Sequence, residues 1–115
     1  MARPDQVQDD QLRDLFVEAQ GSMRTGQANE AVKSVVRALY RLLELKPELT
    51  TEELEPRPGW KMPFLTRWPQ LGANFVEGSL AKHEPKIEFV KEKFALSEAI
   101  TYYEFTLETA IKRGA

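Results

Sequence analysis

The sequence predicts an all-α protein: an up-and-down bundle of four to five helices, in which two antiparallel helical hairpins are joined by a long connection rich in proline and tryptophan. Apolar residues recur at the three- and four-residue spacing of amphipathic helices, and no stretch shows the alternation of a strand. The composition, 42% hydrophobic and 30% charged, is that of a globular domain. Because 115 residues fit one domain, we assign residues 9–115 to a single helical bundle and the mainly polar residues 1–8 to a flexible N-terminal arm.

The first two helices form the clearest predicted hairpin. The first begins at Asp9, whose carboxylate suits a helix N-terminus, and its apolar stripe consists of Leu12, Leu15, Phe16, Ala19 and Met23. The second covers about residues 29–45 and ends before Pro47; its stripe consists of Val32, Val35, Val36, Leu39, Leu42 and Leu43. Gly21 and Gly26 bracket the turn, which is so short that the two helices must run antiparallel.

The second half of the chain shows weaker helical signals before a strong final one. A short helix after Pro69 is expected from Leu71, Phe75 and Ser79. Pro85 suits the first position of another helix, with a stripe of Ile87, Val90 and Phe94. In the last helix Ser97 is the expected N-cap and Gly114 the end; its stripe consists of Ile100, Tyr103, Leu107, Ala110 and Ile111.

Residues 56–69 form the unusual connection, with four of the seven prolines, both tryptophans, three basic residues and no acidic residue. Positive charge and aromatic rings alternate along it in Arg57, Trp60, Lys61, Phe64, Arg67 and Trp68. A connection this long in a small domain suggests a function or a fixed packing role. The rings close the bundle as a lid, anchor a protein interface, or stack on single-stranded nucleic acid. The balanced net charge of −2 argues against a general nucleic-acid surface.

The last helix carries a second apolar edge. Tyr102 and Phe105 lie on a different side of the helix from its predicted apolar stripe. One buried face therefore cannot contain both these two residues and the stripe. Either another helix of the same chain or a second copy covers them. We expect a homodimer that uses Tyr102, Phe105 or the aromatic segment, since two-fold dimers are the commonest assemblies.

Most catalytic and metal-binding chemistry lacks its residues in this chain. There is no cysteine, and the only histidine, His83, lies in a polar turn typical of a surface or capping residue. Glu104 and Glu108 are one helical turn apart, but no Glu-x-x-His pair accompanies them, and Lys112 follows Glu108 at ion-pair spacing. No glycine-rich phosphate loop is present. We therefore expect no catalytic residue, cofactor or metal, and a protein that is not an enzyme.

Nothing in the sequence predicts a membrane protein. No apolar run approaches the roughly 18 residues of a membrane span, and the first residues lack the apolar core of a signal peptide. We expect a cytoplasmic location.

Two families resemble parts of the chain. Residues 19–39, with small residues where paired helices would touch, resemble a tetratricopeptide hairpin, but residues 56–115 contain no second copy. The overall layout resembles HEPN-type bundles, the prokaryotic nucleotidyltransferase-associated domains: a Gly turn, Glu-Ala-Val at residues 30–32, a long connection and a final helix over residues 97–111. The resemblance implies a nucleotide- or RNA-binding module that acts with a separate catalytic partner. Ribonuclease members of this family carry an Arg followed closely by a His on a late helix. In this chain His83 precedes the last two predicted helices, and the nearest upstream arginine, Arg67, lies sixteen positions away. The ribonuclease site is therefore absent.

Two hypotheses of function therefore stand. The first is a non-catalytic helical module for protein interaction or assembly. The alternative is the HEPN-like nucleotide- or RNA-binding module without a ribonuclease site of its own.

Overall fold

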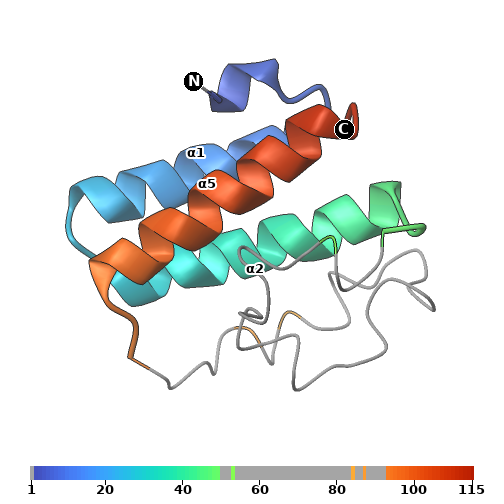
Figure 1. The fold of residues 1–115 in the computed structure, drawn as a ribbon. Coiled ribbons are helices and arrows are strands. Elements are labelled where there is room, and N and C mark those ends of the chain that lie inside the picture. The colour runs from blue at the N-terminus through green and yellow to red at the C-terminus, as the bar shows by residue number, and fades with distance from the viewer. Residues whose placement is uncertain (1, 50–52, 54–83, 85–86, 88–92) are drawn as a thin grey trace.

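The described part of the protein is all-helical. The computed structural model describes residues 2–49, 53, 84, 87 and 93–115, and its elements are the 3-10 helix η1 (Pro4–Gln6) and the α-helices α1 (Asp10–Arg24), α2 (Ala28–Leu45) and α5 (Leu96–Lys112) (Figure 1). The predicted all-α class is confirmed. The residues expected to form the short helix after Pro69 lie outside the described ones.

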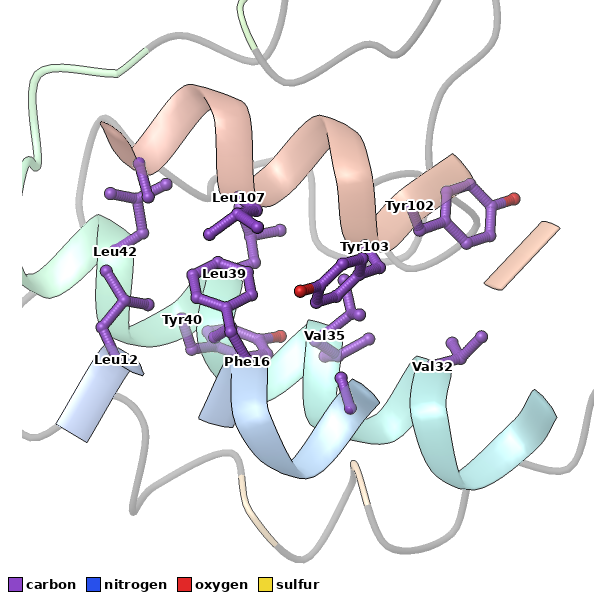
Figure 2. Close-up of a cluster of buried hydrophobic side chains, with 14 of the residues drawn as sticks. Leu12, Phe16, Val32, Val35, Leu39, Tyr40, Leu42, Tyr102, Tyr103 and Leu107 are labelled. Carbon is purple, nitrogen blue, oxygen red and sulfur yellow. The ribbon is translucent and has the colours of Figure 1, made fainter. Parts of the chain in front are cut away.

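Helix α2 is the centre of the fold. Helices α1 and α5 lie side by side and both pack against it, each along one buried face (Figure 1). The core between the three helices includes Leu12 and Phe16 from α1, Leu39 from α2, and Tyr103 and Leu107 from α5 (Figure 2). No residue from Ala31 to Lys46 is fully exposed.

The turn between α1 and α2 lies later than the sequence predicts. Gly21 does not begin the turn but is an internal residue of α1, which continues to Arg24. The reversal occurs at residues 25–27, where Gly26 adopts a φ of 74° that side chains with a Cβ rarely adopt. At the other end of α1 the expected N-cap is confirmed, because Asp9 Oδ2 accepts a hydrogen bond from the Leu12 N–H at 2.9 Å.

The N-terminal segment packs against the ends of α1 and α5. Although this segment is mainly polar, Pro4 is buried and Val7 is 1% exposed. The Gln8 N–H donates to the Ala115 carbonyl at 2.8 Å, and the Arg13 guanidinium donates to the Val7 carbonyl at 2.8 and 3.0 Å. The Arg13 side chain therefore provides the hydrogen-bond donors that the Val7 carbonyl needs.

Helix α5 differs from its prediction in its N-cap and in its buried face. The N-cap is Ala95 and not Ser97; the Ala95 N–H donates to Glu98 Oε1 at 3.0 Å. Ile100, expected in the core, is exposed, and the residues that are buried are Ala99, Tyr102, Tyr103, Thr106, Leu107 and Ala110. The buried stripe is thus rotated toward Tyr102 and Thr106. Gly114, with a φ of 74°, follows the helix as expected.

Three single residues between positions 49 and 93, namely Glu53, Glu84 and Ile87, contact the helices. Glu84 pairs with Arg37 of α2, and Glu53 pairs with Arg113 at the end of α5. Ile87, expected on a helix beginning at Pro85, is fully buried in the core. Within the described ranges no helix is both long and apolar enough to cross a membrane.

Candidate interaction surface

Six of the eight predicted contact residues lie outside the described residues. These are the members of the aromatic segment: Arg57, Trp60, Lys61, Phe64, Arg67 and Trp68. Their assignment as a lid, a protein interface or a nucleic-acid surface stays a prediction. His83 also lies outside the described residues.

The structure buries Tyr102 inside its own chain. Its ring is 1% exposed and meets Phe94 edge-on, with the ring centroids 6.2 Å apart. Burial raises the pKa of the Tyr102 phenol, so the hydroxyl stays neutral at physiological pH. Either the same chain or a second copy was expected to cover this edge of the helix. At Tyr102 the same chain does so, and the Tyr102 ring is not part of the surface.

Phe105 is the predicted contact residue that reaches the surface. Its half-buried ring contributes to a hollow of about 270 Å³ beside the C-terminal half of α5. The other lining residues are Glu53, Glu108, Thr109, Lys112 and Arg113. Two carboxylates and two cations balance one another there, so the hollow has an apolar floor and no net charge that would select an anion or a cation.

Exposed apolar side chains mark the outer faces of α1 and α5. Val17 of α1 is 51% exposed, and Leu96 and Ile100 of α5 are 39% and 38% exposed. They are the large hydrophobic residues exposed within the described part. Phe16 and Tyr103 join the two helices edge-to-face, with centroids 6.0 Å apart, so Val17 and Ile100 belong to neighbouring helices of one layer. We define the α1–α5 outer face by these three residues: Val17, Leu96 and Ile100.

Sequence reasoning missed this face for a specific reason. Ile100 was assigned to the core because it is an isoleucine at helical spacing from Tyr103. The structure instead buries the smaller Ala99 and Thr106 on the core side of α5. Small residues at the contact with α2 were the available signal, since they let two helices approach closely.

A row of cations on α2 was also missed, and the structure shows these charges to be balanced. Lys33, Arg37 and Arg41 follow one another at four-residue spacing, and all three side chains are largely buried. Their carboxylate partners within the described part are Glu30, Glu84, Asp9 and Glu44. A largely buried cation that already has such a partner is not an open anion site, and removal of the partner would leave an uncompensated charge.

The described residues assemble no recognisable catalytic centre. Among them, no three His, Cys, Asp or Glu residues are grouped to hold a metal ion. Glu104 and Glu108 of α5 are both exposed. The buried hydroxyls belong to Ser34, Thr106 and the three tyrosines. Burial raises the pKa of Tyr40 and Tyr103, and Thr106 Oγ1 has no hydrogen-bond partner within the described part.

Comparisons with known proteins assign no family to the chain. No family model matches it, and no curated protein or solved structure resembles it closely enough to count as a match. Inferences about function therefore rest on the described helices and their surfaces.

Proposed function

We propose that this protein is a non-catalytic helical module for protein interaction and assembly, and that it binds through the α1–α5 outer face. The observation that supports the proposal is the exposure of Val17, Leu96 and Ile100, which all lie on these two neighbouring helices. Full burial of such side chains contributes about 1.5–3 kcal/mol each. When such side chains gather into one apolar patch, the patch is typical of a surface that a partner covers.

The proposal includes the assembly expected from the sequence. The chain completes a bundle of four to five helices from two antiparallel hairpins, and it forms a homodimer. The hollow at Phe105 lies on the opposite flank of α5 from Leu96 and Ile100, because residues 105 and 109 follow a different row of the helix from residues 96 and 100. It is a second, weaker candidate for contact.

Site-specific photo-crosslinking in the cells that naturally produce the protein tests this function. A benzophenone side chain at position 100 is expected to form covalent adducts with protein. The matched control carries the same group at Glu48, an exposed residue beyond the end of α2 and outside the α1–α5 outer face. Adducts at position 100 alone support the proposal.

Two outcomes contradict it. Equal crosslinking at positions 100 and 48, or none at either, shows that the outer face is not a specific contact surface. Crosslinks from position 100 to RNA instead of protein favour the HEPN-like alternative, a nucleotide- or RNA-binding module that works beside a separate catalytic partner.

A further inference from the structure

The outer side of α1 carries a regular row of five exposed residues. Asp10, Asp14, Val17, Gly21 and Arg24 follow one another at alternating intervals of four and three residues, and all five are exposed. This spacing keeps residues on one seam of a helix and is the spacing at which paired helices contact each other. The core side of α1, with Leu12, Phe16 and Ala19, is a separate row that packs on α2 and α5. The exposed row is thus a second seam without a partner in the described part.

Charge along this seam is ordered so that it complements itself. Acidic residues stand toward the N-terminal end, Arg24 stands at the C-terminal end, and Val17 and Gly21 lie between them. The midpoint of Asp14 and Arg24 is also the midpoint of Val17 and Gly21. A single two-fold axis at that midpoint therefore sets Asp14 opposite the second copy's Arg24, and Val17 opposite the second copy's Gly21. Symmetry produces each contact twice.

Gly21 has no role inside the described fold. A glycine within a helix destabilises it by about 1 kcal/mol relative to alanine. A Cβ at position 21 would meet no atom within 4 Å, and the residue does not have a positive φ. Neither close packing against the described residues nor backbone conformation therefore requires glycine. A second helix that crosses here does require it, because the missing side chain lets the backbones approach and leaves space for an opposing valine.

The two charged residues of the proposed contacts are available for a partner. Asp10 pairs with Arg13 at 2.9 Å, but neither Asp14 nor Arg24 forms an ion pair with another residue of the described part. Exposed ion pairs add little affinity, yet they select orientation and partner strongly when like charges would otherwise meet.

From these observations we infer that a second copy of this chain docks on α1, with the two α1 helices antiparallel, Val17 packed over Gly21 of the other copy, and Asp14 paired with Arg24 of the other copy. The inference rests on the proposed function, and it names the partner and the register for the α1 part of that surface.

Reversed charges test the register directly. Asp14→Arg makes both positions of the proposed ion pair positive, and Arg24→Asp makes both negative. Each variant alone should dimerise roughly tenfold more weakly than the wild type at low salt, because like charges meet twice in the symmetric pair. An equimolar mixture of the two should form heterodimers, measured by sedimentation velocity and native mass spectrometry. Glu18→Arg, the same kind of change at an exposed α1 position outside the row, should leave dimerisation unchanged.

Substitution of Gly21 separates a role in the interface from a role in the fold. Gly21→Leu should raise the melting temperature of the monomer, because the position is open and leucine favours helix. The same substitution should abolish dimerisation by filling the space that Val17 of the other copy occupies. A residue that served only the fold would change stability and association in the same direction.

The outcomes distinguish this inference from the proposed function. If the wild type is a dimer but the charge variants still self-associate fully and show no preference for each other, the copies meet through another face and the inference is wrong. If the wild type is a monomer while position 100 crosslinks a different protein, the inference and the proposed homodimer are wrong, and the proposed protein-interaction role of the outer face stands. If the wild type is a monomer and position 100 crosslinks no protein, both fail.

Discussion

Asp9 connects the start of α1 to α2 through two interactions that one substitution removes. Its Oδ2 caps α1 by accepting from the Leu12 N–H, and its two oxygens accept from Arg41 Nε and Nη2 at 3.0 and 2.8 Å. The two side chains are 19% and 24% exposed, so the pair is shielded from most of the solvent that weakens surface ion pairs. Asp9→Ala is therefore expected to destabilise the whole three-helix core.

The size of the effect follows from the two interactions lost. Loss of an N-cap costs about 1 kcal/mol, and loss of a hydrogen bond to a charged group costs about 1.5–3 kcal/mol. We expect Asp9→Ala to lower the free energy of unfolding by about 2–4 kcal/mol. For a domain of this size that is a fall in melting temperature of about 10–15 °C. Urea titration followed by circular dichroism measures the first quantity, and a thermal melt measures the second.

Asp9→Asn is the matched control, because asparagine caps a helix as well as aspartate but carries no charge. It should retain the cap and lose the ion pair, so its destabilisation should be about 1 kcal/mol smaller than that of Asp9→Ala. The Arg41 guanidinium holds the pKa of Asp9 below its usual range, and the Leu12 N–H lowers it further against the opposing effect of burial. A lowered folded-state pKa means that the stabilisation is complete above the unfolded value, near pH 4, and is lost as the pH falls through the folded value.

The stability difference between wild type and Asp9→Asn should thus be constant from pH 7 to about 5 and shrink below about 4. A difference that stays the same at pH 3, or an Asp9→Ala variant within about 0.5 kcal/mol of wild type, would refute this account of how α1 is fixed to α2.

Three further predictions concern the core and the turn. Leu39→Ala, at a fully buried position of α2, should lower the free energy of unfolding by about 2–5 kcal/mol in denaturant titration; a loss below 1 kcal/mol would show that the core is not packed as described. Gly26→Ala should destabilise the protein by about 1 kcal/mol, because alanine is strained at a φ of 74°, and an unchanged melting temperature would contradict the turn geometry. Thr106→Val should be neutral or stabilising by up to about 1 kcal/mol, because it removes a buried hydroxyl without a partner; a loss above 1 kcal/mol would reveal a hydrogen bond there.

Apolar periodicity predicts a helix best when one long apolar stripe runs along it and a clear stop signal follows. The second helix was expected over about residues 29–45 and forms over Ala28–Leu45, since its apolar stripe is long and Pro47 stops it. The Asp9 cap was predictable for the same kind of local reason. The prediction that the turn begins at Gly21 was wrong, because α1 continues to Arg24. Helix propensity alone does not show that burial of Phe16 and Ala19 keeps α1 helical through a glycine.

The candidate surface was less predictable than the fold. In α5 both Ile100 and Tyr102 fit a helical stripe, and tertiary packing decides which of them is buried. Charge balance on α2 was equally hidden, because the partners of Arg37 and Arg41 are distant in sequence. Exposure of Val17 follows from the rotation of α1 about its axis, which three-dimensional packing sets.

Native mass spectrometry of the gently purified protein, over a range of concentrations, tests most directly the claim that the α1–α5 outer face mediates assembly. The account predicts a dimer of two chains with no added mass, which Val17→Lys converts to a folded monomer. A wild-type monomer at every concentration, a dimer that Val17→Lys leaves intact, or a bound nucleotide or RNA fragment would contradict it.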